Sequence, residues 1–489
     1  MSNLNSKNKS NNNFAAIYGA LGLSMLTTTA AVTAHHFWRK RNNPNAQLSD
    51  YLEGVTDQLK RIEQANKSWL KSYQGFNDAK EGLVDSHQTA VNNQQPSQSN
   101  KKQKVKWVSG VANKTIAAEF DDFSVVGIAE NRQIIWQTSV PERVHDIVVQ
   151  PVLVALSKYE NGKKLGMNSA PTIRVTDGLL QTPAQHIAVM GRRPSEYFWV
   201  MDCTSGKLVY TIKAKDLNKE NNRHFYGHAC YSLDGNLLYV AENDTKTFAG
   251  IIGVYDVHNG YQKIAEFATH GIGPHELILH PDGDKLVIAN GGIKTERASR
   301  EELNLATMQP SLVYLSLTNG EEGKVLQQIK PKHNQMSVRH ISSITEGNLK
   351  GTVAIGIQFQ GEKHLNMPLV LTHKFGDTAF IEYSTNNGDV SWRQFHHYIA
   401  SVMVNSKSNL ICATSPIGGC VSVFDMVTQK MIDTVKIADC AGIAVADDGF
   451  IVSDGKGGLT WLKVVEGKLE IDRVMLPMAF DNHMQVVES

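Results

Sequence analysis

"GIGPHELILHPDGDKLVIANGG", residues 271–292, consists of two short apolar runs joined by a turn that contains Asp-Gly. A similar phrase, "FYGHACYSLDGNLLYVAEND", occupies residues 225–244. Asp-Gly between short apolar runs is typical of a β-hairpin. In both phrases a histidine, His275 or His228, stands directly before the first apolar run. The repeat therefore indicates a β-protein built from equivalent units, with a histidine at the same place in each of the two.

The same pattern extends from about residue 105 to the C-terminus. Six units of four short strands can be traced, and pieces remain at both ends: residues 123–140 and the C-terminal "HMQVV". Joined, these pieces complete a seventh unit, and closing the ring removes free strand edges. We predict an all-β fold over residues 105–489, a seven-bladed β-propeller of the WD40 or YVTN-like type. A C-terminal inner strand closes it, and an insertion is expected at roughly residues 156–182.

The N-terminal part differs in character. Residues 14–38 contain no Asp, Glu, Lys or Arg, which predicts a signal peptide or membrane anchor within residues 1–38. Apolar residues spaced by three and four from Leu48 onward predict one amphipathic helix, followed by a polar linker, within residues 39–104. The favoured localisation is periplasmic, soluble or anchored to the inner membrane through residues 14–38. Three positive charges at residues 39–41 favour a cytoplasmic side there, so the orientation stays open.

Composition excludes several classes of function. With 49 basic and 48 acidic residues the net charge is +1, and the concentrated basic surface of a nucleic-acid-binding protein is missing. The five cysteines lack the CxxC spacing of zinc fingers and c-type haem sites. Cys412 and Cys420 could form a disulfide or be two small buried residues. The motifs of serine hydrolases, zinc proteases and P-loop proteins do not occur.

In the repeat alignment a histidine opens the inner strand of five units. These histidines are His145, His228, His275, His340 and His483. Because inner strands surround the central channel, their first side chains can converge on its mouth. Neutral imidazoles are good ligands for iron, copper, zinc and nickel, so we predict a transition-metal site, for iron or copper. The alternative is that each histidine caps a strand or bonds to the next blade.

Other polar residues are expected to surround this site. His224 precedes His228 by four residues, and Glu242 ends the neighbouring antiparallel strand at the same rim. Such residues can orient metal ligands by hydrogen bonding. Arg223 and Arg339 each stand beside a rim histidine and could neutralise an acidic ligand or pair with Glu276. The predicted supporting residues are His224, Glu242, Arg223, Arg339 and Glu276.

Several phrases together resemble a bacterial propeller family catalogued as domain of unknown function 1513. They are "RHFYGHACYSLDGNLLYVAEND", "GIGPHELILHPDGDKLVIANGG", "TMQPSLVYL", "SVRH", "TSPIGGCVSVFD" and "DNH". The resemblance covers roughly residues 120–488. It implies export and a periplasmic role linked to iron, with imelysin-type iron-uptake proteins as candidate partners. No twin-arginine pair precedes the apolar segment, so a Sec signal or a retained anchor is expected.

Three functions are compatible with these features. The first is an exported, non-enzymatic propeller that binds a transition metal at the channel mouth. The second is a metal-dependent hydrolase of a lactone or sugar acid, which the fold supports only by analogy. The third is an interaction scaffold whose insertions and N-terminal helix present a partner surface. Metal content separates the first two from the third, and turnover separates the second from the first.

Overall fold

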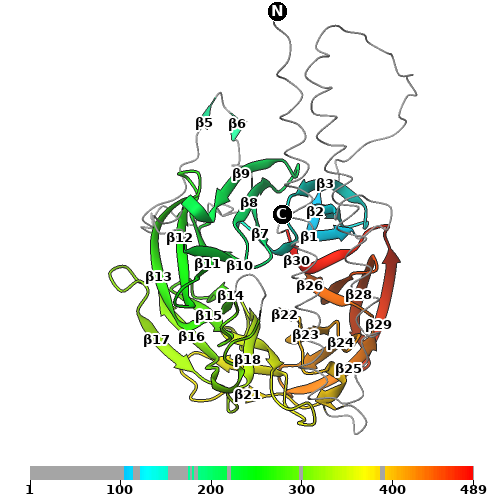
Figure 1. Ribbon diagram of the computed structural model, residues 1–489. Helices are drawn as coiled ribbons and strands as arrows, with labels where there is room; N and C mark the ends of the chain where they lie inside the picture. Colours follow the sequence, from blue (N-terminus) through cyan, green and yellow to red (C-terminus); the bar gives the residue numbers. More distant parts are fainter. Residues whose placement is uncertain are drawn as a thin grey trace, which may run out of the picture. The chain divides into compact units, whose positions relative to one another are not determined.

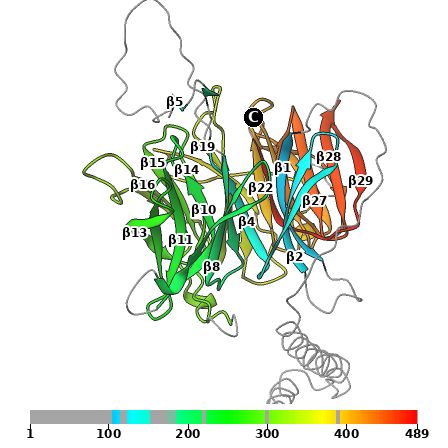
Figure 2. The same ribbon diagram turned by 90° about the horizontal axis from the view of Figure 1, so that it is seen from above.

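A computed structural model describes residues 104–113, 122–151, 175–176, 179–180, 185–216, 222–296, 301–385 and 391–487. Within them, seven four-stranded antiparallel sheets form a ring around a common axis (Figures 1 and 2). The predicted seven-bladed propeller is thus confirmed. The predicted signal or anchor segment, the amphipathic helix and all but the end of the linker lie outside the described residues. In the described part, no helix is long and apolar enough to cross a membrane.

The strands of each blade follow one another in the chain, from the axis outward. The first three blades are β4 (Val144–Val149), β7 (His186–Gly191), β8 (Tyr197–Asp202) and β9 (Leu208–Lys213); β10 (Arg223–Tyr231), β11 (Leu237–Asp244), β12 (Ala249–Asp256) and β13 (Gln262–Ile272); and β14 (Pro274–Leu279), β15 (Lys285–Asn290), β16 (Ser311–Ser316) and β17 (Val325–Ile329). The next three are β18 (Met336–Ser343), β19 (Thr352–Phe359), β20 (Val370–Lys374) and β21 (Ile381–Glu382); β22 (Ser401–Asn405), β23 (Leu410–Ser415), β24 (Cys420–Asp425) and β25 (Lys430–Lys436); and β26 (Cys440–Ala446), β27 (Gly449–Asp454), β28 (Gly458–Val465) and β29 (Lys468–Met475).

Both ends of the propeller meet in the seventh blade. Its order is β30 (Phe480–Val486), β1 (Val105–Asn113), β2 (Asp122–Ala129) and β3 (Ile134–Val140). The C-terminal strand β30 is the inner one, as expected, and pairs with β1. The sequence pattern had placed residues 123–140 in this blade, and the structure adds β1, which precedes them.

Elements outside the blades are short. The insertion predicted at residues 156–182 contributes β5 (Val175–Thr176) and β6 (Leu179–Leu180), which pair with each other. Three 3-10 turns complete the described elements: η1 (Ala214–Asp216), η2 (Leu305–Thr307) and η3 (Trp392–Phe395).

The outermost strand of a blade is much less buried than the second strand, and this difference explains the sequence pattern. Every residue of β15, "KLVIAN", is buried, whereas β17, "VLQQI", alternates between half-buried and exposed. Strands covered on both faces are continuously apolar, and strands covered on one face alternate. The hydrophobic cores lie between neighbouring blades, as where Leu277 and Leu286 pack with Tyr239 and Ile252. This packing holds the seven inner strands side by side around the axis.

Candidate metal centre

The five predicted histidines all lie at irregularities of inner strands. On β4, Val144 and Asp146 pair with consecutive residues of β7, so His145 between them has no partner there. His275 on β14 is left unpaired in the same way. The registers also shift around the remaining three, His228 on β10, His340 on β18 and His483 on β30. A β-bulge releases a side chain from the alternation of the strand, which allows all five to turn toward the axis.

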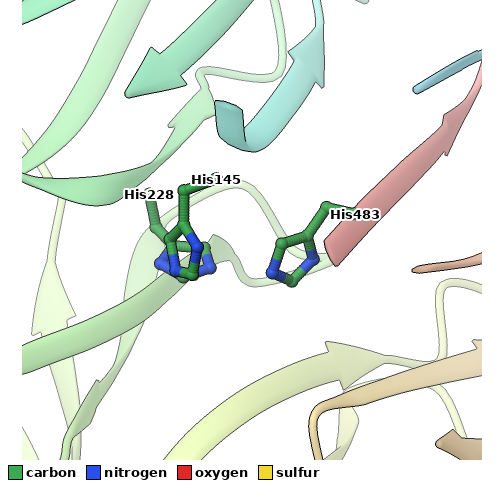
Figure 3. A group of neighbouring side chains, drawn as sticks. All are labelled: His145, His228 and His483. Carbon is green, nitrogen blue, oxygen red and sulfur yellow. The ribbon is translucent and has the colours of Figure 1, made fainter. Parts of the chain in front are cut away.

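The five imidazoles form one compact group, called here the histidine cluster. Around it the ring centroids lie 4.6 Å apart for His145 and His228, 5.1 Å for His228 and His275, 4.5 Å for His275 and His340, 5.0 Å for His340 and His483, and 5.4 Å for His483 and His145. His228 also contacts His483 and His340, at 5.1 and 5.5 Å. Figure 3 shows His145, His228 and His483 converging from three different strands.

The histidine cluster is inside the ring of blades. Its five residues are between 0 and 9% exposed, so the imidazoles lie below the surface rather than at an open channel mouth, where the sequence pattern had placed them. The bulges account for the difference, because each histidine belongs to a paired inner strand instead of preceding it. A buried position removes competing water from any ligand that the imidazoles hold.

Ring nitrogens of the cluster lack hydrogen-bond partners. Nδ1 of His145 and of His275, Nε2 of His483, and both ring nitrogens of His228 are buried with none. Buried polar groups in folded proteins are nearly always paired, and an exception calls for an explanation such as a bound ion. Strand caps would form hydrogen bonds with the backbone, so the alternative reading of these histidines as caps does not account for the free nitrogens. The other alternative, a bond to the next blade, applies to His340, whose Nδ1 lies 3.2 Å from Oε2 of Glu276.

Burial also sets the protonation state of the cluster. It lowers the pKa of His145, His228, His275 and His483 well below the usual 6.5, and repulsion from neighbouring imidazoles adds to the effect. Burial and the charge of Arg339 lower the pKa of His340 to about 3. The imidazoles are therefore neutral at pH 7, the form in which histidine binds metal ions.

The nitrogens fall into two groups with metal-ligand spacing. In one, His145, His228 and His483 offer ligand atoms that all lie within 4.8 Å of one another. In the other, His228, His275 and His340 meet the same criterion. His228 is thus common to both groups.

A third group with similar spacing has another explanation. His280, Asp282 and Asp284 lie near one another at the β14–β15 turn, but both carboxylates are exposed. They pair with Lys285, and Asp282 also pairs with Lys350. These surface ion pairs satisfy the carboxylates without a metal.

Two carboxyl groups adjoin the histidine cluster, the buried Asp146 and the half-buried Glu276. Glu276 accepts a hydrogen bond from the backbone N–H of Ile341 at 2.8 Å, and its Oε2 lies 3.2 Å from Nδ1 of His340. Burial raises the pKa of Glu276 to about 8. Burial and the nearby Glu276 raise the pKa of Asp146 well above its usual value. A carboxylate behind a histidine fixes the orientation of the ring and increases its basicity toward a metal.

Asp146 was not among the sequence-predicted site residues. It directly follows a bulge histidine, His145, as Glu276 directly follows His275. That shared position was the available signal.

Arginines supply positive charge close to the cluster. Arg339 directly precedes His340, and its Nε is buried without a hydrogen-bond partner. Among the described residues no carboxylate forms an ion pair with Arg339, and burial lowers its pKa to about 10. The charges of Arg192 and Arg193 lower the pKa of His145, after burial and the other imidazoles. The cluster therefore has cationic and acidic neighbours.

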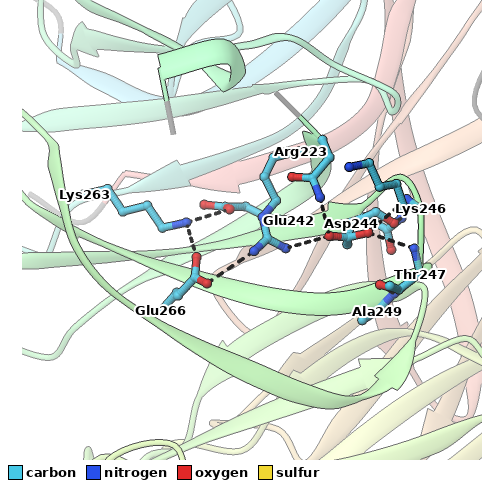
Figure 4. Close-up of polar contacts among 10 residues, drawn as sticks. Arg223, Glu242, Asp244, Lys246, Thr247, Ala249, Lys263 and Glu266 are labelled. Carbon is cyan, nitrogen blue, oxygen red and sulfur yellow. Dashed lines mark hydrogen bonds and ion pairs between the residues drawn. The ribbon is translucent and has the colours of Figure 1, made fainter. Parts of the chain in front are cut away.

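Three of the predicted supporting residues do not adjoin the cluster. Glu242 is buried within its blade, where it accepts hydrogen bonds from Tyr255 at 2.6 Å and Lys263 at 2.8 Å. Arg223 lies 3.6 Å from Asp244 (Figure 4). The strand ends do meet as antiparallel pairing predicts, but these charged side chains find partners inside their own blade.

His224 is the third of these residues. It stacks at a tilt on Tyr226, with ring centroids 5.8 Å apart, and contacts no imidazole of the cluster. The bulge between the two histidines of β10 separates their side chains.

The cysteines take no part in the cluster. Cys412 and Cys420 are buried free thiols on neighbouring strands, and each pairs in register with another residue, Val423 and Ser415 respectively. The disulfide considered from the sequence is absent from the described residues.

Comparisons with known proteins found one family and remote structural likenesses. The profile of a family described as "Protein of unknown function (DUF1513)" matches residues 175–487. No curated protein matches the chain.

Three solved structures are similar to this chain at a distance. A chain of a mitotic checkpoint complex is 10% identical, with a TM-score of 0.44, over 68% of this chain and 91% of the other. Hydrazine synthase of Kuenenia stuttgartiensis is 13% identical, with a TM-score of 0.45, over 73 and 90%. The WD40 repeats of RRP9 are 11% identical, with a TM-score of 0.45, over 61 and 80%.

Proposed function

The chain belongs to the DUF1513 family of proteins of unknown function, and we propose that its propeller binds a transition metal through the histidine cluster. The observation that carries this proposal is the set of buried ring nitrogens without hydrogen-bond partners. An unpaired buried polar atom costs roughly 1–3 kcal/mol. A metal ion offsets that cost for several nitrogens at once.

The donor set is compatible with the proposed iron or copper. All five donors are imidazoles, which suit copper, iron, zinc and nickel, whereas thiolates would favour Cu(I) or zinc. Burial raises the thiol pKa of Cys230 far above the usual value, and the nearby Asp146 and Glu276 raise it further. The thiol therefore stays protonated. Asp146 and Glu276 have raised pKa values in the metal-free chain, and a bound cation would favour loss of their protons, so that they could supply negative charge beside it. These arguments support an imidazole-only first coordination sphere.

The wider role follows from the resemblance of the sequence to exported family members. We propose that the protein acts in the periplasm, soluble or attached through residues 14–38, and that iron-uptake proteins are its partners. Binding rather than turnover is the proposed activity. Cell fractionation with a C-terminal tag tests the compartment, and a cytoplasmic protein would contradict the role in periplasmic iron handling.

Metal content tests the central proposal. We would strip the full chain with a chelator, add Cu(II) or anaerobic Fe(II), and measure bound metal by elemental mass spectrometry. The double variant His228→Ala/His275→Ala should lose the metal, because it removes donors from both groups. The matched control is His224→Gln, which changes a buried histidine of the same strand outside the cluster. Equal, low metal content in the native chain and the double variant would contradict the proposal.

A further inference from the structure

We propose that the histidine cluster holds two metal ions rather than one, and that His228 bridges them through its two ring nitrogens. This inference rests on the proposed metal-binding function and adds the number of ions and their connection. It starts from the fact that the two groups of ligand atoms share one residue, His228. In the cluster, His228 is also the residue with both ring nitrogens buried and unpaired.

Spacing argues against one ion held by the whole cluster. Two nitrogens bound to the same ion lie at most about 4 Å apart, twice a metal–nitrogen bond of about 2.1 Å. The described ligand atoms satisfy a limit of 4.8 Å only in threes, never as four or five histidines together. The limit of 4.8 Å is slightly wider than a single ion allows, so small ring movements would let one ion reach three imidazoles, and two ions are needed to engage all five.

His228 has the position that a bridging ligand requires. Its ring contacts those of the other four histidines, at centroid distances of 4.6, 5.1, 5.1 and 5.5 Å. His145 and His483 would complete one ion's donors, and His275 and His340 those of the other. Three nitrogens on each ion leave room for further ligands, as in catalytic rather than structural metal sites.

The proton balance of such a bridge is simple. A neutral imidazole has one lone pair and one N–H, so His228 must release its N–H proton to bind a second ion. The proton passes to bulk water, and the resulting imidazolate donates one lone pair to each ion. No oxidation state changes. The single negative charge between the ions reduces their mutual repulsion.

The orientation of the His340 ring agrees with the same two-ion arrangement. Glu276 lies 3.2 Å from Nδ1 of His340, which directs Nε2 of that ring away from the carboxylate and makes it the metal-binding nitrogen. Carboxylate–histidine–metal arrangements of this kind are common.

The test counts ions and measures their coupling. The stripped full chain is titrated with Cu(II), and native mass spectrometry counts the copper ions bound at saturation. Two ions are expected in the native chain, and one in each of the double variants His145→Ala/His483→Ala and His275→Ala/His340→Ala. The Cu(II) signal in electron paramagnetic resonance should be greatly diminished in the native chain, because an imidazolate bridge couples the unpaired electrons of the two Cu(II) ions. Each double variant should show the full signal of one isolated ion.

Variants of His228 complete the test. His228→Gln keeps a polar side chain but cannot bridge, so any copper retained should give an uncoupled signal. His224→Gln is the control and should bind two coupled ions. One copper in the native chain, or two with full uncoupled signals, would overturn the bridge but leave metal binding intact. Binding of neither copper nor anaerobic Fe(II) by any form of the chain would overturn the proposed function itself. Circular dichroism of each variant verifies folding, and an unfolded His228→Gln chain leaves the native stoichiometry and coupling as the deciding results.

Discussion

At the scale of single residues, the histidine cluster has two neighbours that can carry opposite charges, Glu276 and Arg339. Glu276 contacts His340 directly and accepts the backbone N–H of Ile341. Burial lowers the pKa values of His275 and His340, and the positive charge of Arg339 lowers them further. The carboxylate should therefore assist cation binding, and the guanidinium should oppose it while keeping the imidazoles neutral.

Removing the carboxylate should weaken metal binding. Glu276→Ala is expected to reduce copper affinity about 10- to 100-fold, the usual effect of losing a group that orients a metal-bound histidine. Isothermal titration calorimetry measures the change. Glu242→Gln is the control, since Glu242 is also shielded from solvent but pairs with Lys263 inside its own blade. Unchanged affinity in Glu276→Ala would exclude a role for this carboxylate.

Removing the arginine should strengthen metal binding. A unit charge near a divalent ion contributes from about 1 kcal/mol in a water-like dielectric to several kcal/mol in a protein-like one, so Arg339→Gln is expected to tighten copper binding at least about fivefold. The same calorimetric titration measures it. Lys324→Gln, at a position 61% exposed, should have no effect because solvent screens its charge. Weaker binding in Arg339→Gln would show that the guanidinium serves the site in another way.

At the scale of elements, bulges of the inner strands decide which side chains reach the axis. The residues of β22 pair with β23 without a shift, and that strand contributes no histidine. β26 has a shift, but Ala441 and Gly442 occupy it. The other five inner strands combine a shift with a histidine, so bulge and residue type together make the cluster.

The bulge of β10 depends on Gly227. This residue has φ +104°, and a Cβ there would lie 2.5 Å from Cδ2 of His145. Gly227→Ala should cost roughly 2–4 kcal/mol, from the strained backbone and the displaced ring, and should lower metal occupancy. Chemical denaturation measures the first effect.

Gly347→Ala isolates the backbone part of this effect. Gly347 has φ +76° with nothing within 4 Å of a Cβ, so about 1 kcal/mol is expected and metal occupancy should not change. Equal losses of stability in the two variants would mean that Gly227 does not need the space beside His145.

At the scale of the whole molecule, stability depends on the junction between the last and first blades. Asp481 on β30 accepts three hydrogen-bond contacts, of 2.7 to 3.0 Å, from the guanidinium of Arg143, which precedes β4. Hydrogen bonding to Asp481 raises the pKa of Arg143, against the effect of burial. The pair joins blade seven to blade one. Asp481 lies two residues before His483 on β30.

Breaking this junction should destabilise the ring. Asp481→Ala is expected to cost roughly 1–3 kcal/mol, less than a fully buried pair because the Arg143 side chain is 30% exposed. Thermal unfolding measures it. Asp472→Ala removes another inter-blade ion pair, with Arg132, whose carboxylate is 65% exposed, and should change stability by less than about 0.5 kcal/mol. A similar small change in Asp481→Ala would contradict the importance of the junction.

The metal-free protein should lose stability in acid. The cluster histidines have folded pKa values below 6.5, and burial lowers that of His224 to about 4. Between these values and 6.5 the unfolded chain binds protons at these histidines that the folded chain does not. Glu276 and Asp146, with raised pKa values, act in the opposite direction, but the histidines outnumber them, so stability falls as the pH drops below 6.5. Each such histidine contributes up to roughly 1.4 kcal/mol per pH unit.

Urea unfolding between pH 7.5 and 4.5 tests the acid sensitivity. In His224→Gln the change of unfolding free energy with pH should be smaller by the contribution of one histidine. In the native chain, bound copper should delay the loss of stability to a lower pH. Stability independent of pH over this range would contradict the buried, neutral state of the cluster.

Much of the fold was predictable because its periodicity is local. Asp-Gly turns and short apolar runs recur in each blade, and the apolar pieces at the two chain ends fit one blade only when joined. β1 was not predicted as a strand, although it lies within the predicted propeller of residues 105–489. Glu242 and Arg223 were wrongly predicted to support the histidine site. Their sequence positions place them at the same rim of the propeller but do not show which charged residue each side chain pairs with.

The sequence by itself determined the propeller, the number of its blades, its C-terminal closure and the five histidines that share one place in the repeat. These follow from turn chemistry and alternation, which act over a few residues. Only the tertiary structure decided that the imidazoles are buried, mutually in contact and divided into two groups around His228. Burial, bulges and ring contacts arise where five strands distant in the chain meet, and no local pattern encodes the distances between them.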